Sequence, residues 1–201
     1  EGRSLPLLLV HDGTAFMRIG GLANVLEALL GEGRVRPVRL AFIEPADRFS
    51  EYAFDEPYAR FSMEELLPFV ENEYPSSGER LLMGASLGGL MSATLALGEP
   101  GHFSGLATFS GAFYGTPDDR DFYRSRESWV LERVRENAYG TLRWHLDVGT
   151  IEWLTEVNRE LAGALAENGS EHAFDERNAG HNWTNWKNGL APALEFLLGR
   201  D

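Results

Sequence analysis

A serine flanked by glycines follows a short apolar run near the middle of the chain. The stretch from Gly84 to Gly89 has the sequence Gly-Ala-Ser-Leu-Gly-Gly and comes directly after Leu81–Met83. A sharp turn from a strand into a helix needs small residues on both sides, because larger side chains would clash. Such a turn exposes the hydroxyl of Ser86 and leaves the N–H of Leu87 free to bind an oxyanion. The pattern predicts a serine nucleophile, with a plain glycine-rich turn as the alternative.

A serine nucleophile needs a general base, and the chain has five histidines. His102 and His172 precede predicted strands, which places them at the opposite end of a parallel sheet from Ser86. His145 lies inside a strand, and His11 ends the first strand but comes before the serine. His181 follows the last strand, in the order serine, acid, histidine. We therefore expect His181 to be the base, with an ordinary surface-loop histidine as the alternative.

The acid that orients the histidine should follow the fifth predicted strand. Glu152 comes directly after this strand, where a carboxylate can hold the second nitrogen of the imidazole. The alternative is an acid that only stabilises a helix N-terminus. Asp147 is the competing candidate, but it lies inside the strand, on the face opposite the apolar residues. We expect Glu152 to be the acid.

An oxyanion hole requires a second backbone donor besides Leu87. The loop after the first strand contains Gly13 and Thr14, and we expect one of their N–H groups to supply it.

Two further side chains are expected near the substrate. Trp183 follows the histidine closely and would form an aromatic wall, and Arg48 would bind substrate, with a salt bridge to Glu51 or another carboxylate as the alternative.

Apolar runs that alternate with segments of helical period predict the elements that carry these residues. An α/β fold follows, with a mostly parallel sheet of about six strands and helices on both faces. Ligands then bind at the carboxyl ends of the strands. The predicted strands are Leu5–Val10, Val38–Ile43, Leu81–Met83, Gly105–Phe109, Leu142–Val148 and one that begins at His172–Phe174. The predicted helices are one that ends at Gly31, one capped by Ser62, Leu87–Leu97, one with a stripe from Trp153 to Leu165, and Trp186–Leu198.

The whole chain, residues 1–201, is expected to form one domain. Residues 111–140 are polar, aromatic and irregular, which indicates a lid-like insertion between the fourth and fifth strands. Tyr114, Tyr123 and Trp129 lie in or beside it and are candidates for stacking on a substrate, with ordinary packing as the alternative.

Composition excludes several classes of function. A net charge of −13 makes nucleic acid or an anionic membrane an unsuitable partner. The lack of cysteine excludes disulfides, thiolate metal sites and a cysteine nucleophile. The sequence has no apolar run long enough to span a membrane. No cofactor or metal is expected, and the oligomeric state is not predicted. A cytoplasmic location is expected. Export is the alternative, because the chain begins at Glu1 rather than at a methionine and a signal peptide could have preceded it.

Several segments together resemble the putative esterase family of α/β-hydrolases, which includes enterochelin esterases, feruloyl esterases and esterase D. The resemblance implies an α/β-hydrolase fold and favours Glu152 over Asp147 as the acid. Two or so antiparallel strands that usually begin this fold are lacking here. The matching segments are His11–Gly13, Arg48–Tyr52, Glu64–Pro68, Gly84–Gly89, Ser110–Gly111, Gly149–Glu152, and Gly180–Trp183 with Trp186.

The resemblance implies a serine carboxylesterase that acts on a small-molecule ester or lactone through an acyl-enzyme on Ser86. The segment Arg48–Tyr52 has the Arg-x-x-Glu-Tyr pattern of the enterochelin esterase branch, which makes an enterochelin esterase-like activity the first expectation. A feruloyl or acetyl esterase acting on carbohydrate esters is the alternative within the same chemistry. A non-catalytic binding member of the fold is the alternative from another class.

Overall fold

The computed structural model describes residues 4–121, 124–136 and 140–199. Its six strands form one parallel sheet in the order β2-β1-β3-β4-β5-β6. This confirms the predicted parallel sheet of about six strands. The strands are β1 (Leu5–His11), β2 (Arg39–Ile43), β3 (Ser76–Ala85), β4 (Gly105–Phe109), β5 (Arg143–Gly149) and β6 (His172–Arg177).

The central strands are continuously apolar because both of their faces are covered. In β1 the four residues from Leu7 to Val10 are at most 1% exposed. Such runs are typical of parallel strands that lie between two layers of helices. Because all six strands run in the same direction, their carboxyl ends meet at one edge of the sheet, where the predicted site residues follow them.

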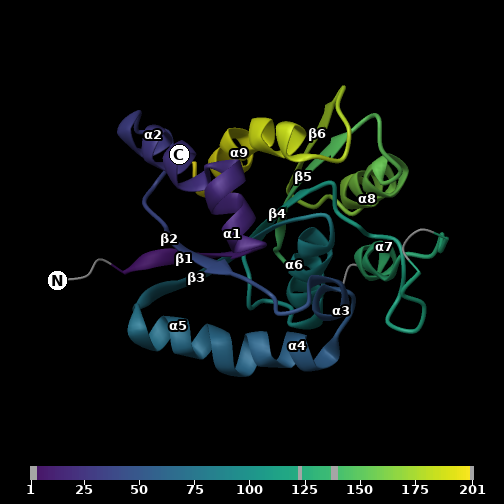
Figure 1. Cartoon of the computed structure of the whole chain (residues 1–201), viewed down its shortest axis with the longest axis horizontal. Helices are drawn as coiled ribbons and strands as arrows, with labels where there is room; N and C mark the ends of the chain where they lie inside the picture. Colours follow the sequence, from purple (N-terminus) through teal and green to yellow (C-terminus); the bar gives the residue numbers. More distant parts are fainter. Residues whose placement is uncertain (1–3, 122–123, 137–139, 200–201) are drawn as a thin grey trace.

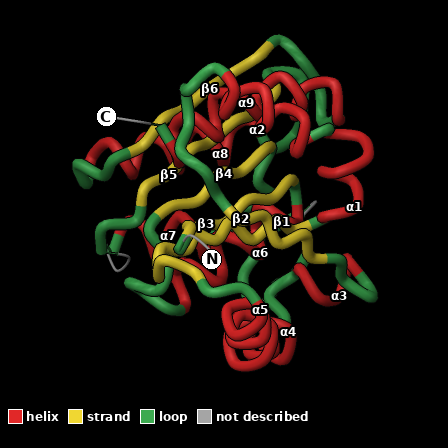
Figure 2. Tube along the Cα trace, turned by 90° about the vertical axis from the view of Figure 1, so that its left-hand side faces the viewer, coloured by secondary structure: helices red, strands yellow, loops and turns green. Residues whose placement is uncertain are grey.

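Helices cover the two faces unequally (Figures 1 and 2). On one face, α2 (Leu22–Gly31) and α9 (Trp183–Leu198) pack with the short segments α1 (Gly13–Ala15) and η1 (Phe16–Gly20). The remaining helices pack on the other face. They are α3 (Arg48–Tyr52), α4 (Glu56–Phe61), η2 (Ser62–Leu66), α5 (Leu67–Glu73), α6 (Leu87–Gly98), α7 (Trp129–Arg135) and α8 (Thr155–Glu167).

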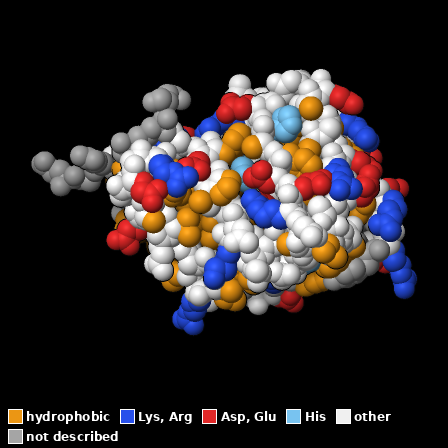
Figure 3. All heavy atoms as spheres, turned by 90° about the horizontal axis from the view of Figure 1, so that it is seen from above, with side chains coloured by type: hydrophobic (Ala, Val, Ile, Leu, Met, Phe, Trp, Pro, Cys, Tyr) orange, Lys and Arg blue, Asp and Glu red, His pale blue; other side chains and the backbone are white. Residues whose placement is uncertain are grey.

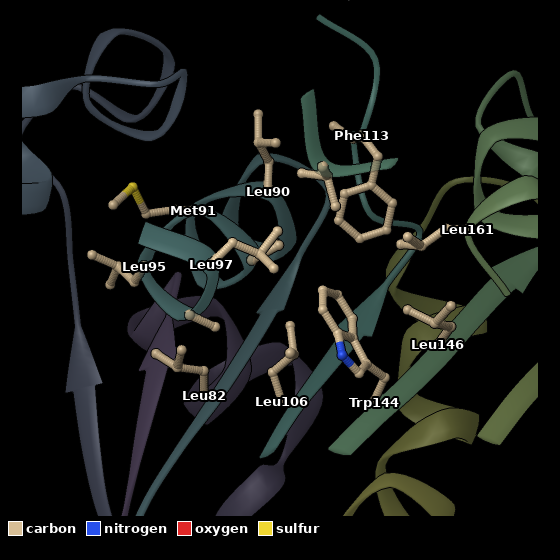
Figure 4. Packing of buried hydrophobic residues seen from close by; sticks show 14 of the residues in the cluster. Leu82, Leu90, Met91, Leu95, Leu97, Leu106, Phe113, Trp144, Leu146 and Leu161 are labelled. Atoms are coloured by element: carbon tan, nitrogen blue, oxygen red, sulfur yellow. The ribbon is translucent and has the colours of Figure 1, made fainter. Parts of the chain in front are cut away.

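The larger of the two cores lies between the sheet and α6. Trp144 on β5 points toward Phe113, and Leu106 of β4, Leu146 of β5 and Leu161 of α8 lie beside the two rings (Figure 4). Trp144 and Phe113 are both fully buried. This core fixes α6, whose first residue follows Ser86, against the centre of the sheet.

The helix predicted to start after Ser62 begins earlier, and Ser62 is not its N-cap. Asp55 caps α4 by accepting a hydrogen bond from the N–H of Tyr58. The chain then continues without a break through η2 into α5, as one long helical rod in Figure 1. Ser62 lies inside this rod and donates its hydroxyl hydrogen to the carbonyl of Tyr58 at 2.8 Å. A serine inside a helix uses the same local hydrogen bonding that makes it a good cap, which explains the error.

The predicted lid-like insertion at residues 111–140 contains a helix. Helix α7 buries Val130, Leu131 and Val134 in the larger core. Tyr114 is also buried there. Tyr123, a predicted stacking residue, lies outside the described residues. The described part of the segment is therefore packed into the domain to a greater extent than its polar composition predicts.

Acidic side chains are scattered over the face of the molecule drawn in Figure 3. On this face they are interspersed with basic and hydrophobic side chains. Ion pairs such as Arg34–Glu195 join charged side chains of opposite sign. Among the described residues, none of the helices has the length and apolar character that crossing a membrane requires.

Candidate active site

Ser86 lies at the tight turn between β3 and α6. Its backbone has φ 54° and ψ −119°, which residues other than glycine rarely adopt and which is typical of strained functional turns. Gly84 lets the end of β3 lie close to the backbone of Gly88 at the start of α6. A Cβ at position 84 would lie 2.2 Å from the carbonyl oxygen of Gly88, so only a glycine fits there. The N–H of Ser86 donates to the carbonyl of Phe109 at 2.8 Å, which fixes the turn against β4.

His181 connects the hydroxyl of Ser86 with the carboxylate of Glu152. Its Nε2 lies 3.0 Å from Oγ of Ser86, and its Nδ1 lies 2.5 Å from Oε2 of Glu152. His181 belongs to the loop between β6 and α9, and Glu152 belongs to the turn after β5. The structure thus brings together the three side chains that the sequence predicted for catalysis, each from just beyond a strand end.

The carboxylate of Glu152 is completely buried and hydrogen-bonded on both oxygens. Oε1 accepts from the N–H of Gly149 at 2.7 Å and from the hydroxyl of Ser110 at 2.7 Å, while Oε2 faces His181. Thr155 donates its hydroxyl hydrogen to the carbonyl of Gly149 and so holds this turn. Hydrogen-bond donors of this kind stabilise a charge that burial alone would disfavour.

Asp147, the competing acid, lies at a different place. Its fully buried carboxylate forms an ion pair with Arg177 at the end of β6. Burial lowers the pKa of the Arg177 guanidinium below its ordinary value. A Cβ on Gly189 of α9 would lie only 2.3 Å from Oδ2 of Asp147, so this carboxylate faces α9. Among the described residues, the carboxylate bonded to His181 is that of Glu152.

Two other histidines are buried and neutral near pH 7. Burial lowers the pKa of His11 to about 3, and its Nδ1 lies 2.9 Å from Oγ of Ser92. Burial lowers the pKa of His145 to about 4, although the nearby carboxylate of Asp175 acts in the opposite direction. Both side chains are at most 1% exposed, so they are structural rather than accessible groups.

The predicted oxyanion donors lie on two different elements. Leu87 is the first residue of α6, and an N–H at that position has no acceptor within its own helix. Gly13 and Thr14 begin α1 after β1. The N–H of Thr14 donates to Oε2 of Glu44 at 2.9 Å, so a carboxylate already holds one of the two candidate donors.

A pocket of about 250 Å³ opens beside Ser86 and His181. Trp153 lies on its wall, 4.6 Å from the ring of His181 between ring centres, and is 48% exposed. The sequence placed Trp153 on the buried stripe of a helix, but α8 begins two residues later, at Thr155. The other lining residues in the described part of the chain are Arg48, Phe49, Leu87, Ala112 and Leu154.

Of the two predicted substrate contacts, one lies on this pocket. Arg48 lines it, but its guanidinium is also paired with the carboxylate of Asp12. Trp183 packs edge-on against Phe16 and Trp186 and is not among the described residues that line the pocket. Trp129, a predicted stacking residue, lines a separate cavity of about 540 Å³ between α4 and the end of α6.

The sequence did not predict the side chains that hold the carboxylate of Glu152 in place. Ser110 donates to Glu152, and Nε1 of Trp186 donates to Oγ of Ser110 at 2.9 Å. The Ser110–Gly111 pair and the second tryptophan after His181 were the available signals, but neither indicates a side-chain contact. In the described residues, histidine and carboxylate side chains form no group of three or more that could hold a metal ion.

Comparison with known proteins places the chain in a family. Residues 1–197 match the sequence model of the family described as "Putative esterase". YjcH, an uncharacterized protein of Bacillus subtilis strain 168, is 27% identical over 214 residues, which cover 96% of this chain and 84% of YjcH.

Solved structures share the fold. A ferulic acid esterase superimposes with a TM-score of 0.81 at 22% identity, covering 98% of this chain and 86% of that one. The enterobactin esterase FES from Shigella flexneri, solved in the presence of enterobactin, gives a TM-score of 0.85 at 23% identity. That match covers 98% of this chain but 51% of FES, so this chain spans about half the length of that enzyme. These matches confirm the predicted α/β-hydrolase fold.

Proposed function

Because the chain belongs to the Putative esterase family and is a carboxylic ester hydrolase, we propose that it works as a serine hydrolase with Ser86 as nucleophile, His181 as general base and Glu152 as the orienting acid. The observation that carries this proposal is the unbroken line of contacts from Oγ of Ser86, through both nitrogens of His181, to Oε2 of Glu152. The strained backbone of Ser86 supports it, because strain of this kind persists where function requires it.

In the proposed reaction, Nε2 of His181 takes the hydroxyl proton as Oγ of Ser86 attacks the ester carbonyl. The tetrahedral intermediate collapses, the C–O bond of the leaving alcohol breaks, and His181 gives this alcohol the proton. Water then attacks the acyl-enzyme in the same way and releases the acid and free Ser86. Glu152 keeps the imidazole in the required tautomer and stabilises its positive charge in each step.

Two backbone N–H groups would stabilise the oxyanion, and Leu87 supplies one of them. The second comes from Gly13 or Thr14, because the end of β1 that precedes them lies against Gly88, just after the turn at Ser86. Thr14 would donate to an oxyanion only after Glu44 leaves its N–H. Removal of one such donor usually lowers kcat by a factor of about 10²–10³, so the hole makes a large contribution of its own.

The first candidate substrate is an enterochelin-like lactone or a related ester. The segment Arg48–Tyr52 supports this candidate through its Arg-x-x-Glu-Tyr pattern. The fold shared with an enterobactin esterase agrees with it, although this chain spans only about half of that enzyme.

A second candidate, a neutral feruloyl or acetyl ester on a carbohydrate, is favoured by the charges around the pocket. The guanidinium of Arg48 is neutralised by Asp12, and the net charge of −13 repels an anionic ferric catecholate. The remaining lining side chains in the described part of the chain, among them Phe49 and Trp153, are uncharged apart from the titratable His181. An aromatic or apolar acyl group suits such walls.

A fluorophosphonate probe tests the chemistry. We expect covalent labelling at Ser86, identified by peptide mass spectrometry, and loss of labelling in Ser86→Ala. Folded wild-type protein that is neither labelled nor active would contradict the proposal and favour a binding member of the fold. A turnover panel of trilactone siderophore, feruloyl-sugar, acetyl-sugar and short 4-nitrophenyl esters then separates the two candidate substrate classes.

A further inference from the structure

We propose that Ser110 and Trp186 are positioning residues that fix the Glu152 carboxylate for its contact with His181. This inference rests on the proposed roles of Ser86, His181 and Glu152. The three side chains form a chain of hydrogen bonds in which Nε1 of Trp186 donates to Oγ of Ser110 at 2.9 Å, and this hydroxyl donates to Oε1 of Glu152 at 2.7 Å.

The acid needs such support because it is a glutamate in a buried place. A glutamate has one more rotatable bond than an aspartate, so the orientation of its carboxylate must be fixed by its surroundings. Oε1 is held by the N–H of Gly149 and the hydroxyl of Ser110, and this leaves Oε2 for Nδ1 of His181. Loss of the Ser110 hydroxyl would leave the fully buried carboxylate with one donor fewer and freer to turn.

Trp186 sets the direction of the Ser110 hydroxyl. An indole N–H is a donor only, whereas a hydroxyl has one hydrogen and can also accept. When Trp186 occupies a lone pair of Oγ, the hydroxyl hydrogen is directed to Glu152. The ring of Trp186 also lies edge-on to the ring of His181, at 5.0 Å between ring centres. One buried side chain therefore contacts both the histidine and the support of its acid.

The backbone of Ser110 gives independent support. Its φ is +50°, a value that glycine adopts with less strain than serine. Its N–H donates to the carbonyl of Asp147 at 2.6 Å, which fixes this conformation at the end of β4. A serine at a position better suited to glycine indicates that its side chain is used, and the contact that it makes is the one with Glu152.

Two replacements of Ser110 separate the hydroxyl from the backbone strain. Ser110→Ala removes the hydroxyl and keeps the strain, whereas Ser110→Gly removes both. We expect kcat for a 4-nitrophenyl ester to fall about 10-fold or more in both variants, as loss of a hydrogen bond to a charged group implies. KM should stay within about two-fold, because the pocket lining is unchanged. Ser62→Ala is the control and should keep wild-type kcat, because it removes another buried serine hydroxyl that bonds within its own helix and does not line the pocket.

Trp186→Phe tests the second step, because it keeps a ring beside His181 and removes the N–H. We expect kcat to fall about three-fold, and we expect Ser110→Ala/Trp186→Phe to lose no more than Ser110→Ala alone, since the indole N–H acts through the hydroxyl. All rates are referred to folded protein, measured by near-ultraviolet circular dichroism and urea unfolding.

The outcomes separate this proposal from the proposed function. Absence of turnover and labelling in the wild type overturns the serine mechanism itself. An active wild type with unchanged kcat in Ser110→Ala overturns the positioning role alone. Recovery of wild-type kcat in Ser110→Gly would show that the loss in Ser110→Ala comes from backbone strain and not from the missing hydroxyl. Additive losses of kcat in the double variant would show that Trp186 acts through the packing of its ring. Either result also overturns the positioning role.

Discussion

The guanidinium of Arg48 forms a bidentate ion pair with the carboxylate of Asp12 beside Ser86. Nε lies 2.7 Å from Oδ1 and Nη2 lies 2.9 Å from Oδ2. Nη2 also donates to the carbonyl of Ala85 at 3.0 Å, directly before the nucleophile. The pair therefore ties the end of β1, which carries the oxyanion loop, to the turn that carries Ser86. It also cancels the one arginine charge among the described residues that line the pocket.

Asp12→Asn should change the preference for charged substrates. The backbone of Asp12 has φ 58°, which asparagine tolerates well, so the loop should keep its shape. With its partner neutral, Arg48 would attract a negative acyl group, and we expect the preference for an anionic ester over a neutral one to rise about 10-fold at low salt. The measurement is the ratio of kcat/KM for the 4-nitrophenyl monoester of succinate to that for 4-nitrophenyl acetate.

Glu51→Gln is the control for the Asp12 variant. It also removes one negative charge, at a residue of α3. The carboxylate of Glu51 accepts a hydrogen bond from the N–H of Ala46 rather than from Arg48. Equal changes of preference in both variants would show an effect of overall charge and contradict the role given to the Arg48–Asp12 pair.

Glu152→Gln and Asp147→Asn should have different effects. The first replaces the carboxylate bonded to His181 and should lower kcat about 10²–10⁴-fold while the protein stays folded. The second breaks the ion pair between the buried Asp147 and the partly exposed Arg177, which Asp175 also approaches, and should lower the free energy of unfolding by about 1–3 kcal/mol, with a far smaller loss of kcat per folded molecule. Urea unfolding and kcat corrected by active-site titration check both, and the reverse ranking of kcat would reassign the acid to Asp147.

The positions of the site residues along the chain could be predicted because they depend on backbone topology. In a parallel sheet every strand ends at the same edge, so the order of strands and loops already places Ser86, Glu152 and His181 at one rim. The three side chains lie within hydrogen-bonding distance in the structure. Their catalytic roles remain a prediction that the variants above test.

Side-chain contacts between distant segments could not be predicted in the same way. Ser110 and Trp186 are 76 residues apart, and nothing in either local sequence specifies that they meet. Trp153 falls on the helical period of the leucines that follow it, yet the chain is still in a turn at this residue and leaves its ring exposed beside His181. Hydrophobic period gives the face of a helix but not the residue at which the helix begins.

Gly84→Ala should disrupt the nucleophile turn. The new Cβ would lie 2.2 Å from the carbonyl oxygen of Gly88, a backbone atom that cannot move without shifting the start of α6. We expect loss of esterase activity and a free energy of unfolding lower by about 1–3 kcal/mol, as for other overpacked sites. Gly163→Ala is the control, because that exposed helical position has open space around it and should gain about 0.5–1 kcal/mol. Normal activity in Gly84→Ala would contradict the close approach.

The buried neutral histidines should make stability fall as the pH is lowered from about 6.5. Burial lowers the pKa of His11 to about 3 and that of His145 to about 4, whereas both titrate near 6.5 in the unfolded chain. Between these values the unfolded state binds more protons than the folded state, so the free energy of unfolding rises with pH. Each histidine contributes a slope of up to about 1.4 kcal/mol per pH unit in this window, and neither contributes above it.

His11→Asn should flatten this dependence by the share of one histidine. Asparagine does not titrate, and its amide can replace the contact between Nδ1 of His11 and Ser92. Urea unfolding at several pH values between 5.0 and 7.5 gives the slopes. The slopes are compared rather than the absolute stabilities, because the smaller side chain also leaves space beside Tyr52. This range stays above that in which carboxylates such as Glu71 and Glu79 lose their charge, since arginine partners hold the pKa values of both below normal. An unchanged slope in His11→Asn would mean that His11 is not buried in the neutral form.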